Sequence, residues 1–271
     1  MTRDIGAEFR ALHQPGTPFI LANAWDVGSA KMLAGLGAQA IATSSAAHAF
    51  TLGRPDGGHV TRDESLAHAQ DLVAATGLPV SGDFENGYGD APEDCAETVR
   101  LSGEIGLAGI SIEDEDFGNG TAYDFDLAIE RIKAAAAAAR ALSHDFVLVA
   151  RADGVMNGHY DLAEAIRRIQ AMDAAGADCL YVPVPPGVEQ LKQVLAATTK
   201  PVNALAVGPL SKVSRAEFAA MGVARISLGS ALARVTHRAI HDNAKAMFED
   251  GDFTGLGHSI SGGKIDALLA K

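Results

Sequence analysis

The chain has 271 residues, of which 48% are hydrophobic and 21% are charged, a balance typical of a globular protein with a large core. Its formal net charge is -12, so it lacks the basic excess that nucleic acids and anionic membranes attract. Its first ten residues contain no apolar segment like that of a signal peptide, and no apolar run reaches the roughly 20 residues that cross a bilayer. We therefore expect a cytoplasmic protein that acts on small molecules or binds other proteins, with no nucleic-acid or membrane partner.

Short runs of apolar residues predict eight buried strands, separated by stretches with helical spacing. The predicted strands are residues 19–22, 40–43, 79–83, 109–113, 146–151, 179–182, 201–205 and 225–228. The predicted helices include residues 29–36, 62–75, 92–105, 126–142, 162–175 and 188–197. Glycines that cap helices precede several strands, at Gly37, Gly106, Gly176 and Gly222.

This regular alternation predicts an α/β protein, a (β/α)8 TIM barrel formed by residues 1–271 as a single domain. The rival fold is a doubly wound open sheet, which usually has a glycine-rich first turn. No GxGxxG sequence follows the first predicted strand, which favours the barrel.

Residues 230–271 exceed what the barrel needs and form a predicted C-terminal helical extension. Residues 230–250 predict one or two helices with an apolar face, and the glycine-rich residues 251–263 precede a last short helix. That face must be buried. From the pattern alone it either covers its own barrel as an eighth helix or packs against a second subunit.

Polar residues follow the predicted strands at their carboxyl ends, where the active sites of such barrels lie. They are Asn23, Asp26, Ser44, Ser45, Asp83, Glu85, Glu113, Asp114, Arg151, Asp153 and Asn203. Although they are scattered in the sequence, the barrel would bring them to one end of the molecule.

Three of these residues, Asp83, Glu85 and Glu113, place carboxylates on neighbouring strands, where their mutual repulsion is costly without a cation. Mg2+ fits such a site because it takes one or two carboxylates directly and keeps several waters. Mn2+ is the alternative metal. The acids could instead cap helices or pair with arginines on the rim, but three acids at successive strand ends favour the metal.

Arg151 ends a buried apolar strand, and its guanidinium requires an anion because it cannot lose its charge. It either neutralises the neighbouring acids or binds a substrate carboxylate, and the two roles are compatible. The turn at Ser44 and Ser45 offers hydroxyl and N–H groups to a carboxylate.

The remaining candidates carry weaker patterns. His48 and Tyr88 are candidate proton donors near strand ends, and Trp25 is a candidate wall of the substrate pocket, although each could equally be a packed side chain. Cys95 and Cys179 have no CxxC spacing and are interpreted as two reduced, packed thiols.

In order along the chain, several motifs resemble those of the isocitrate lyase and phosphoenolpyruvate mutase superfamily, and the resemblance covers nearly the whole sequence. The motifs are Asn23-Ala24-Trp25-Asp26, Ser44-Ser45, Gly53-Arg54-Pro55-Asp56, Asp83-Phe84-Glu85-Asn86-Gly87-Tyr88-Gly89, Ser111-Ile112-Glu113-Asp114 and Ala150-Arg151-Ala152-Asp153. Members of this superfamily are (β/α)8 barrels that bind Mg2+ and α-oxo carboxylates and stabilise an enolate.

The resemblance implies a role for each matching residue. Asp83 would bind the metal directly, while Asp56, Glu85 and Glu113 would hold its waters. Arg151 and the turn at Ser44 and Ser45 would bind the carboxylate and oxo oxygen of the substrate. The remaining assignments, catalytic for Glu113, Arg151, Tyr88 and His48 and substrate-binding for Trp25, Asp26 and Asn203, are predictions for the same site. The resemblance also implies a homo-oligomer, a dimer or a dimer of dimers (a homotetramer), in which the C-terminal helix is exchanged between subunits.

Two departures from the superfamily pattern limit the choice of reaction. The superfamily often has aspartate where Glu85 stands, so this acid reaches one methylene further. Its lyases carry a cysteine in the loop that corresponds to residues 115–124, whereas that loop has no cysteine here and is acidic apart from Asn119. An isocitrate or methylisocitrate lyase is therefore disfavoured, and a phosphoryl-like group would be poorly accommodated.

These observations predict a Mg-dependent enzyme that cleaves or decarboxylates a small α-oxo or 2-hydroxy acid, such as an oxaloacetate-like substrate, through an enolate. The first alternative is a phosphonate enzyme, either a phosphoenolpyruvate phosphonomutase or a phosphonopyruvate hydrolase, supported by Asn119. The second is a barrel that binds α-oxo acids without catalysis.

Overall fold

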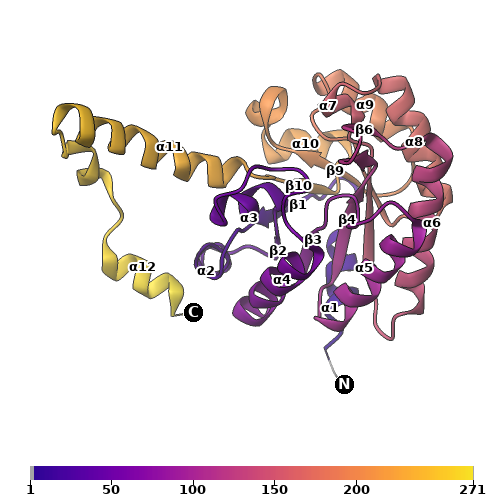
Figure 1. The fold of residues 1–271 in the computed structure, drawn as a ribbon, viewed down its shortest axis with the longest axis horizontal. Helices are drawn as coiled ribbons and strands as arrows, with labels where there is room; N and C mark the ends of the chain where they lie inside the picture. Colours follow the sequence, from indigo (N-terminus) through magenta and orange to yellow (C-terminus); the bar gives the residue numbers. More distant parts are fainter. Residues whose placement is uncertain (1–2, 271) are drawn as a thin grey trace.

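The computed structural model describes residues 3–270, and its core is a closed barrel of eight parallel strands (Figure 1). Around the barrel the order is β1-β2-β3-β4-β7-β8-β9-β10, with β10 paired to β1. The strands are β1 (Phe19–Asn23), β2 (Ala40–Ala42), β3 (Val80–Asp83), β4 (Gly109–Glu113), β7 (Val147–Arg151), β8 (Cys179–Tyr181), β9 (Val202–Leu205) and β10 (Arg225–Ser227). The predicted (β/α)8 TIM barrel is confirmed, and each predicted strand coincides with an observed one.

Helices surround the barrel, and their apolar faces pack on the outside of the sheet (Figure 1). They include α2 (Val27–Gly35), α4 (Arg62–Thr76), α5 (Pro92–Glu104), α6 (Phe125–Ala141), α8 (Leu162–Ala174), α9 (Val188–Ala196) and α10 (Arg215–Met221). Gly37, Gly106, Gly176 and Gly222 all have positive φ angles at the ends of helices, where glycine adopts the left-handed conformation without strain.

Several shorter elements complete the fold. They are α1 (Ile5–Leu12), α3 (Ser45–Thr51), α7 (Gly154–Asn157), the hairpin of β5 (Glu115–Asp116) and β6 (Thr121–Ala122), and the single turns η1 (Gly208–Lys212), η2 (Ala246–Asp250) and η3 (Thr254–His258). Helix α1 buries Phe9 against Phe19 of β1, with their ring centroids 6.0 Å apart. It thereby covers the amino end of the barrel and leaves the carboxyl end free for a site.

The C-terminal extension leaves the barrel as α11 (Ala231–Lys245) and ends as α12 (Gly262–Leu269), which returns to the side of α2 (Figure 1). Apolar side chains on the projecting part stay exposed, with Val235 at 63%, Ile240 at 64% and Phe248 at 86%. Helix α11 therefore does not cover its own barrel, and its burial in a second subunit stays a prediction.

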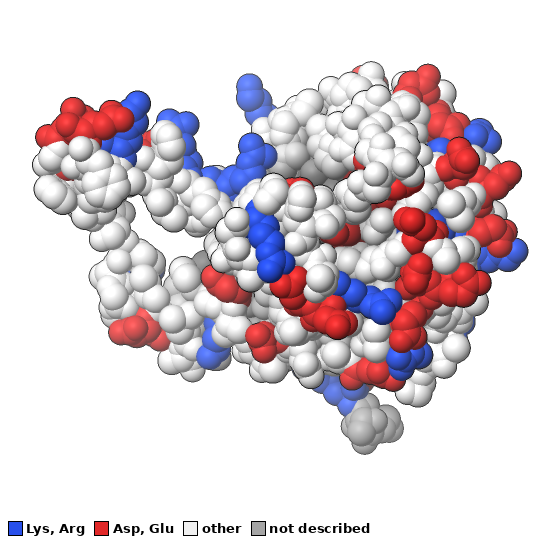
Figure 2. Space-filling view, viewed as in Figure 1, with Lys and Arg blue, Asp and Glu red and all other residues white. Residues whose placement is uncertain are grey.

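The distribution of charged side chains on the surface is consistent with the negative net charge. On the face shown in Figure 2, acidic and basic side chains are interspersed and no broad basic surface is present. Within residues 3–270, every helix is too short or too polar to span a membrane.

Candidate active site

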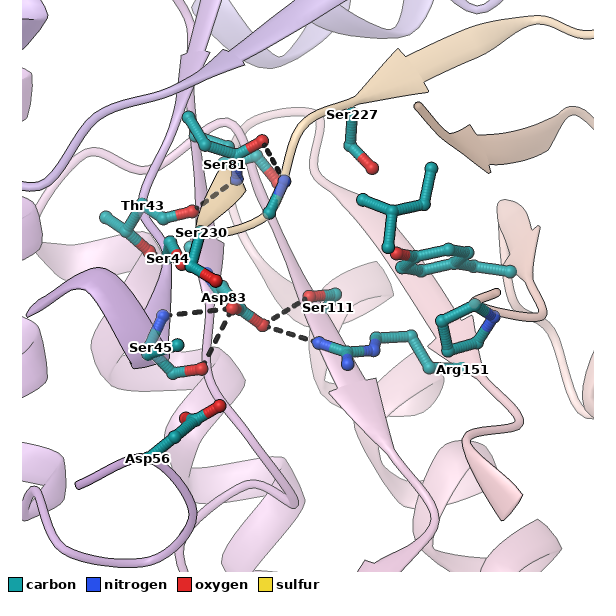
Figure 3. A pocket seen from close by; sticks show the side chains of 18 of the residues that line it. Thr43, Ser44, Ser45, Asp56, Ser81, Asp83, Ser111, Arg151, Ser227 and Ser230 are labelled. Carbon is teal, nitrogen blue, oxygen red and sulfur yellow. Dashed lines mark hydrogen bonds and ion pairs between the residues drawn. The ribbon is translucent and has the colours of Figure 1, made fainter. Parts of the chain in front are cut away.

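A cavity of about 140 Å³ opens at the carboxyl ends of the strands (Figure 3). Its walls come from the ends of β1, β2, β7, β8 and β9, from β3, β4 and β10, from the segment after β2, and from the residues just before α11. The residues that carry polar groups into it include Asn23, Ser44, Ser45, Asp56, Ser81, Asp83, Ser111, Arg151, Tyr181, Arg225 and Ser227.

Asp83, the last residue of β3, lies at the centre of the hydrogen bonds in this cavity (Figure 3). Its Oδ2 accepts hydrogen bonds from both the backbone N–H and the hydroxyl of Ser45, each at 3.0 Å. Its Oδ1 accepts from Arg151 at 2.7 Å and from Ser111 at 3.3 Å. Ser44 caps α3 through its hydroxyl, which orients the first N–H groups of that helix toward the carboxylate.

Arg151 is nearly buried and is surrounded by carboxylates. Its guanidinium lies 2.7 Å from Asp83, 2.9 Å from Glu113 and 2.5 Å from Asp153. Burial opposes the charge of the guanidinium, but these three carboxylates raise the pKa of Arg151 well above its ordinary value. Arg151 therefore neutralises the acids beside it, as one of its two predicted roles requires.

A second cavity, of about 240 Å³, adjoins the first and is rich in acids. Asp56, Glu85, Glu113 and Asp153 line it, and Arg151 lines both cavities. Burial, reinforced by the neighbouring carboxylates, raises the pKa of Asp56, and raises the pKa of Glu113 well above its usual range. Burial also raises the pKa of Glu85 to about 7, although the N–H of Gly58 donates to its carboxylate.

The backbone after β3 is held in an uncommon conformation. Glu85 and Tyr88 have φ angles of 45° and 62°, a region that residues other than glycine rarely adopt and that costs about 1–3 kcal/mol each. The carbonyl of Glu85 accepts a hydrogen bond from the N–H of Glu113 at 2.9 Å, which fixes this turn against β4. This strained backbone lowers the stability of the fold and directs Glu85 into the acidic cavity.

Across residues 3–270, no three Asp, Glu, His or Cys side chains converge as a ready-made set of metal ligands. The predicted arrangement, in which Asp83 alone binds directly and the other acids act through water, does not require such a set.

Three predicted residues lie elsewhere, in an open cavity that Trp25, Asp26, His48 and His68 line together. Asp26 caps α2 through a hydrogen bond with Ser29, and the ring of His48 stacks on that of His68 at 3.9 Å. Burial lowers the pKa of His48 to about 4. The structure thus separates this group from the Asp83 cavity.

Two further predicted residues are also set apart. Tyr88 packs its ring against Phe84 and lines a fourth cavity beside Glu85. Asn203 lies buried inside the barrel, where its Nδ2 donates to Ser227 at 2.8 Å and its Oδ1 accepts from Arg225 at 2.9 Å. Asn203 therefore supports the cavity wall.

The loop after β4 forms the β5–β6 hairpin beside the acidic cavity. Glu115 accepts hydrogen bonds from Asn157 at 2.8 Å and from His159 at 2.9 Å, which ties the hairpin to α7 and the turn after it. Asn119 lies at the exposed tip, where it donates to Asp116. Asn119 is thus turned away from both cavities.

Sequence reasoning gave no role to Ser111, Ser81 or Arg225, all of which line the Asp83 cavity. A signal was present in the strands: Ser111 stands two residues before Glu113, so the two side chains point to the same face. Arg225, the first residue of β10, likewise carries a charge within a short strand whose residues are all buried.

Comparison with known proteins places this geometry in a family. The family model described as phosphoenolpyruvate phosphomutase matches residues 9–248. A crystal structure from Burkholderia cenocepacia J2315 is 44% identical, with a TM-score of 0.93 over 98% of this chain and 95% of that chain.

Several curated relatives have named activities, and two of them are more than 30% identical over two thirds of this chain. The oxaloacetate decarboxylase of Rhodopseudomonas palustris is 32% identical over 74% of this chain and 70% of its own length. The 2,3-dimethylmalate lyase of Eubacterium barkeri is 31% identical over 69% and 66% of the two chains. With a family model that spans most of the sequence and a barrel that carries the matching motifs, this chain belongs to the phosphoenolpyruvate phosphomutase family, within the isocitrate lyase and phosphoenolpyruvate mutase superfamily.

Proposed function

We propose that this protein is a divalent-metal-dependent carbon–carbon lyase that cleaves a small α-oxo or 2-hydroxy acid through an enolate, with decarboxylation of an oxaloacetate-like acid as its simplest form. The observation that carries the proposal is the cavity in which Asp83, Ser45 and Arg151 meet beside an excess of buried acids. Relatives that are named as an oxaloacetate decarboxylase and a dimethylmalate lyase support this class of reaction.

The donor set fits a hard cation. Asp56, Glu85, Glu113 and Asp153 share a cavity with the single arginine Arg151, and burial raises the pKa of each of these acids. Asp83 would hold Mg2+, or Mn2+ in its place, and Asp56, Glu85 and Glu113 would hold its waters. When bound, the metal would stabilise the negative charge that develops on the oxo oxygen of the substrate.

The residues of the chain position the substrate. The N–H and hydroxyl of Ser45 donate to Asp83, and the same turn at the start of α3 would bind the substrate carboxylate when Asp83 holds the metal. In decarboxylation the bond to the leaving carboxylate breaks, its electron pair enters the enolate, and CO2 departs. A proton then completes the product. Because loss of CO2 generates the enolate directly, no base of the chain is needed to start the reaction.

The phosphonate alternative has little support at this site. Asn119, its one predicted residue, donates to Asp116 at an exposed tip, and the loop around it carries acids. The remaining alternative, a barrel that binds without catalysis, predicts ligand binding with no product.

An assay on a panel of acids tests the proposal. The purified protein is incubated with oxaloacetate, methylated malates, isocitrate, methylisocitrate and phosphonopyruvate, with Mg2+, with Mn2+ and with a chelator. We expect metal-dependent turnover of oxaloacetate or a methylated malate. Turnover of phosphonopyruvate alone would replace the proposal with a phosphonate enzyme, and binding without any product would favour the non-catalytic barrel.

A further inference from the structure

Arg225 is a buried cation that lacks an acidic partner. It is the first residue of β10, and only 4% of it is exposed. Its Nε donates to the amide oxygen of Asn203 at 2.9 Å, but its Nη1 is buried without a hydrogen-bond partner among residues 3–270. Within the same residues, no carboxylate lies at ion-pair distance from its guanidinium.

Such an arrangement is expensive, because a guanidinium stays charged when it is buried and its unpaired donors lose their hydration. Other buried arginines of this chain avoid that cost. Arg168 pairs with Asp114 and Glu164, and Arg131 donates to the backbone carbonyls of Asn86, Gly89 and Asp90. Arg225 is therefore an exception to the way this fold treats its buried guanidinium groups.

Arg225 lines the same cavity as Asp83, from the opposite end of the barrel strands. Asp83 and Arg151 are the last residues of their strands, whereas Arg225 is the first residue of its own. Small polar side chains of Ser81, Ser111 and Ser227 lie along the walls, together with the larger Tyr181 and Leu205.

The two arginines of this cavity differ in their charge balance. Arg151 faces three carboxylates within 2.9 Å, so its charge is already neutralised. Among residues 3–270, Arg225 has no carboxylate at ion-pair distance, and Asn203 and Ser227 hold it in place through successive hydrogen bonds. An anion that enters the cavity therefore finds an available cation at Arg225, at the deep end.

We propose that Arg225 binds the second carboxylate of a small dicarboxylic acid whose other end lies beside Asp83 and Ser45. This inference rests on the proposed function, and it assigns to Arg225 the binding of the distal carboxylate that an oxaloacetate-like acid carries. The cavity of about 140 Å³ matches a small acid, since a cavity of about 150 Å³ accepts a molecule the size of benzene.

We expect Arg225 to contribute to binding of the substrate and not to the chemical step. In a decarboxylation the distal carboxylate becomes neutral CO2, so its ion pair with Arg225 weakens as the bond breaks. An interaction that is stronger before the reaction than during it lowers KM without raising kcat. Replacing Arg225 should therefore raise the KM of a dicarboxylic substrate and leave kcat undiminished.

The test compares two probes that differ by the distal carboxylate, malate and lactate, by calorimetric titration of the full chain in the presence of Mg2+. The variants are Arg225→Met, which keeps the length of the side chain, and Lys192→Met, which removes the same charge from the exposed face of α9. Circular dichroism establishes that both fold. Where the panel assay finds a dicarboxylic substrate, KM and kcat are measured as well.

We expect the wild-type protein and Lys192→Met to bind malate at least about tenfold more tightly than lactate, the scale of a charge-assisted hydrogen bond, and Arg225→Met to lose that preference. Its affinity for lactate should not change. Equal binding of the two acids by the wild type, or a preference that persists in Arg225→Met, would overturn the inference and leave the proposed function intact. Failure of the wild type to bind either acid would overturn the inference, and the panel assay decides the proposed function separately.

Discussion

At the scale of single residues, the cavity depends on one carboxylate. Asp83 receives two hydrogen bonds from Ser45, one from Ser111 and one from Arg151, so its position is set by α3, β4 and β7 together. A carboxylate that is held on both oxygens is already oriented before a ligand arrives. The orientation of the Asp83 carboxylate therefore does not depend on any single one of these partners.

The first prediction concerns metal binding. Asp83→Ala should lower the affinity for Mg2+ by at least about tenfold, because the variant lacks the one carboxylate that is proposed to touch the ion. The barrel should stay folded. Calorimetric titration measures the affinity, with Asp126→Asn on the exposed first turn of α6 as the control. Undiminished affinity in a folded Asp83→Ala variant would refute the assignment.

The second prediction concerns the thiols. Cys95 and Cys179 are both buried, and burial raises the pKa of each thiol to about 11, so little of the reactive thiolate forms at neutral pH. Activity should therefore survive treatment of the native protein with an alkylating reagent. Mass spectrometry counts the modified thiols alongside the assay. Inactivation that substrate prevents would show that a cysteine reaches the site.

The site residues show where sequence reasoning succeeds and where it stops. Asp83, Glu113 and Arg151 end strands, so the barrel topology alone brings them together. Trp25 and Asp26 follow β1 and His48 lies within α3 after β2, yet all three line a separate cavity, because the turn after β1 and the helix α3 direct them away from the Asp83 cavity. The direction of a side chain in a turn depends on local dihedral angles and caps, which the pattern of apolar residues does not encode.

At the scale of elements, the residue that ends α1 contributes to the acid sensitivity of the fold. His13, at its end, is buried beside Phe9 and Phe19, with ring centroids 4.7 Å and 5.0 Å away, and burial lowers its pKa to about 3. In the unfolded chain the ring regains an ordinary pKa of about 6.5. The unfolded state therefore binds an extra proton between those two values, and the contribution to stability is complete above about pH 6.5 and is lost as the pH falls.

The third prediction follows from that difference. When the pH falls from 7 to 5, protonation of His13 in the unfolded state should by itself lower the free energy of unfolding by about 2 kcal/mol. His13→Gln, which cannot titrate, should lose that part of the pH dependence. Urea unfolding of both proteins at the two pH values measures it. The same slope in the variant and the wild type would show that His13 is protonated equally in both states.

Elements were predictable in proportion to their length and regularity. The long helices α4, α5, α6 and α8 and all eight barrel strands follow from apolar spacing and glycine caps, because the same pattern repeats around the barrel. The short helices α3 and α7 and the β5–β6 hairpin did not follow. Each is stabilised by local caps or by contacts with distant residues, as Glu115 of the hairpin is by Asn157 and His159.

At the scale of the whole molecule, the projecting α11 is the feature that most requires a partner. Val235, Ile240 and Phe248 lie exposed on it and on the turn that follows, and a surface of this kind on a stable protein marks an interaction site. We propose that α11 packs against a second copy of the chain, which gives a dimer or a dimer of dimers.

The fourth prediction tests that assembly. Light scattering at low micromolar concentration should report a dimer or a tetramer for the full chain, and truncation after Gly229 should give a smaller or unstable species. Ile240→Glu should weaken the assembly, because it buries a charge in the contact, whereas His241→Glu adds the same charge at a polar position that is also exposed. A well-folded monomer of the full chain would contradict the proposal.

The contact between α12 and α2 joins two elements that lie almost a whole chain apart in sequence. Leu268 packs against Gly35, where an added Cβ would lie only 3.2 Å from the leucine side chain, so the fit leaves no space for another residue. During synthesis α2 emerges well before α12, which leaves this surface of α2 uncovered until α12 has been made. Closure of so long a loop is slow, and exposed apolar surface invites aggregation meanwhile. We therefore expect the contact between α12 and α2 to be among the last to form when the protein folds on the ribosome.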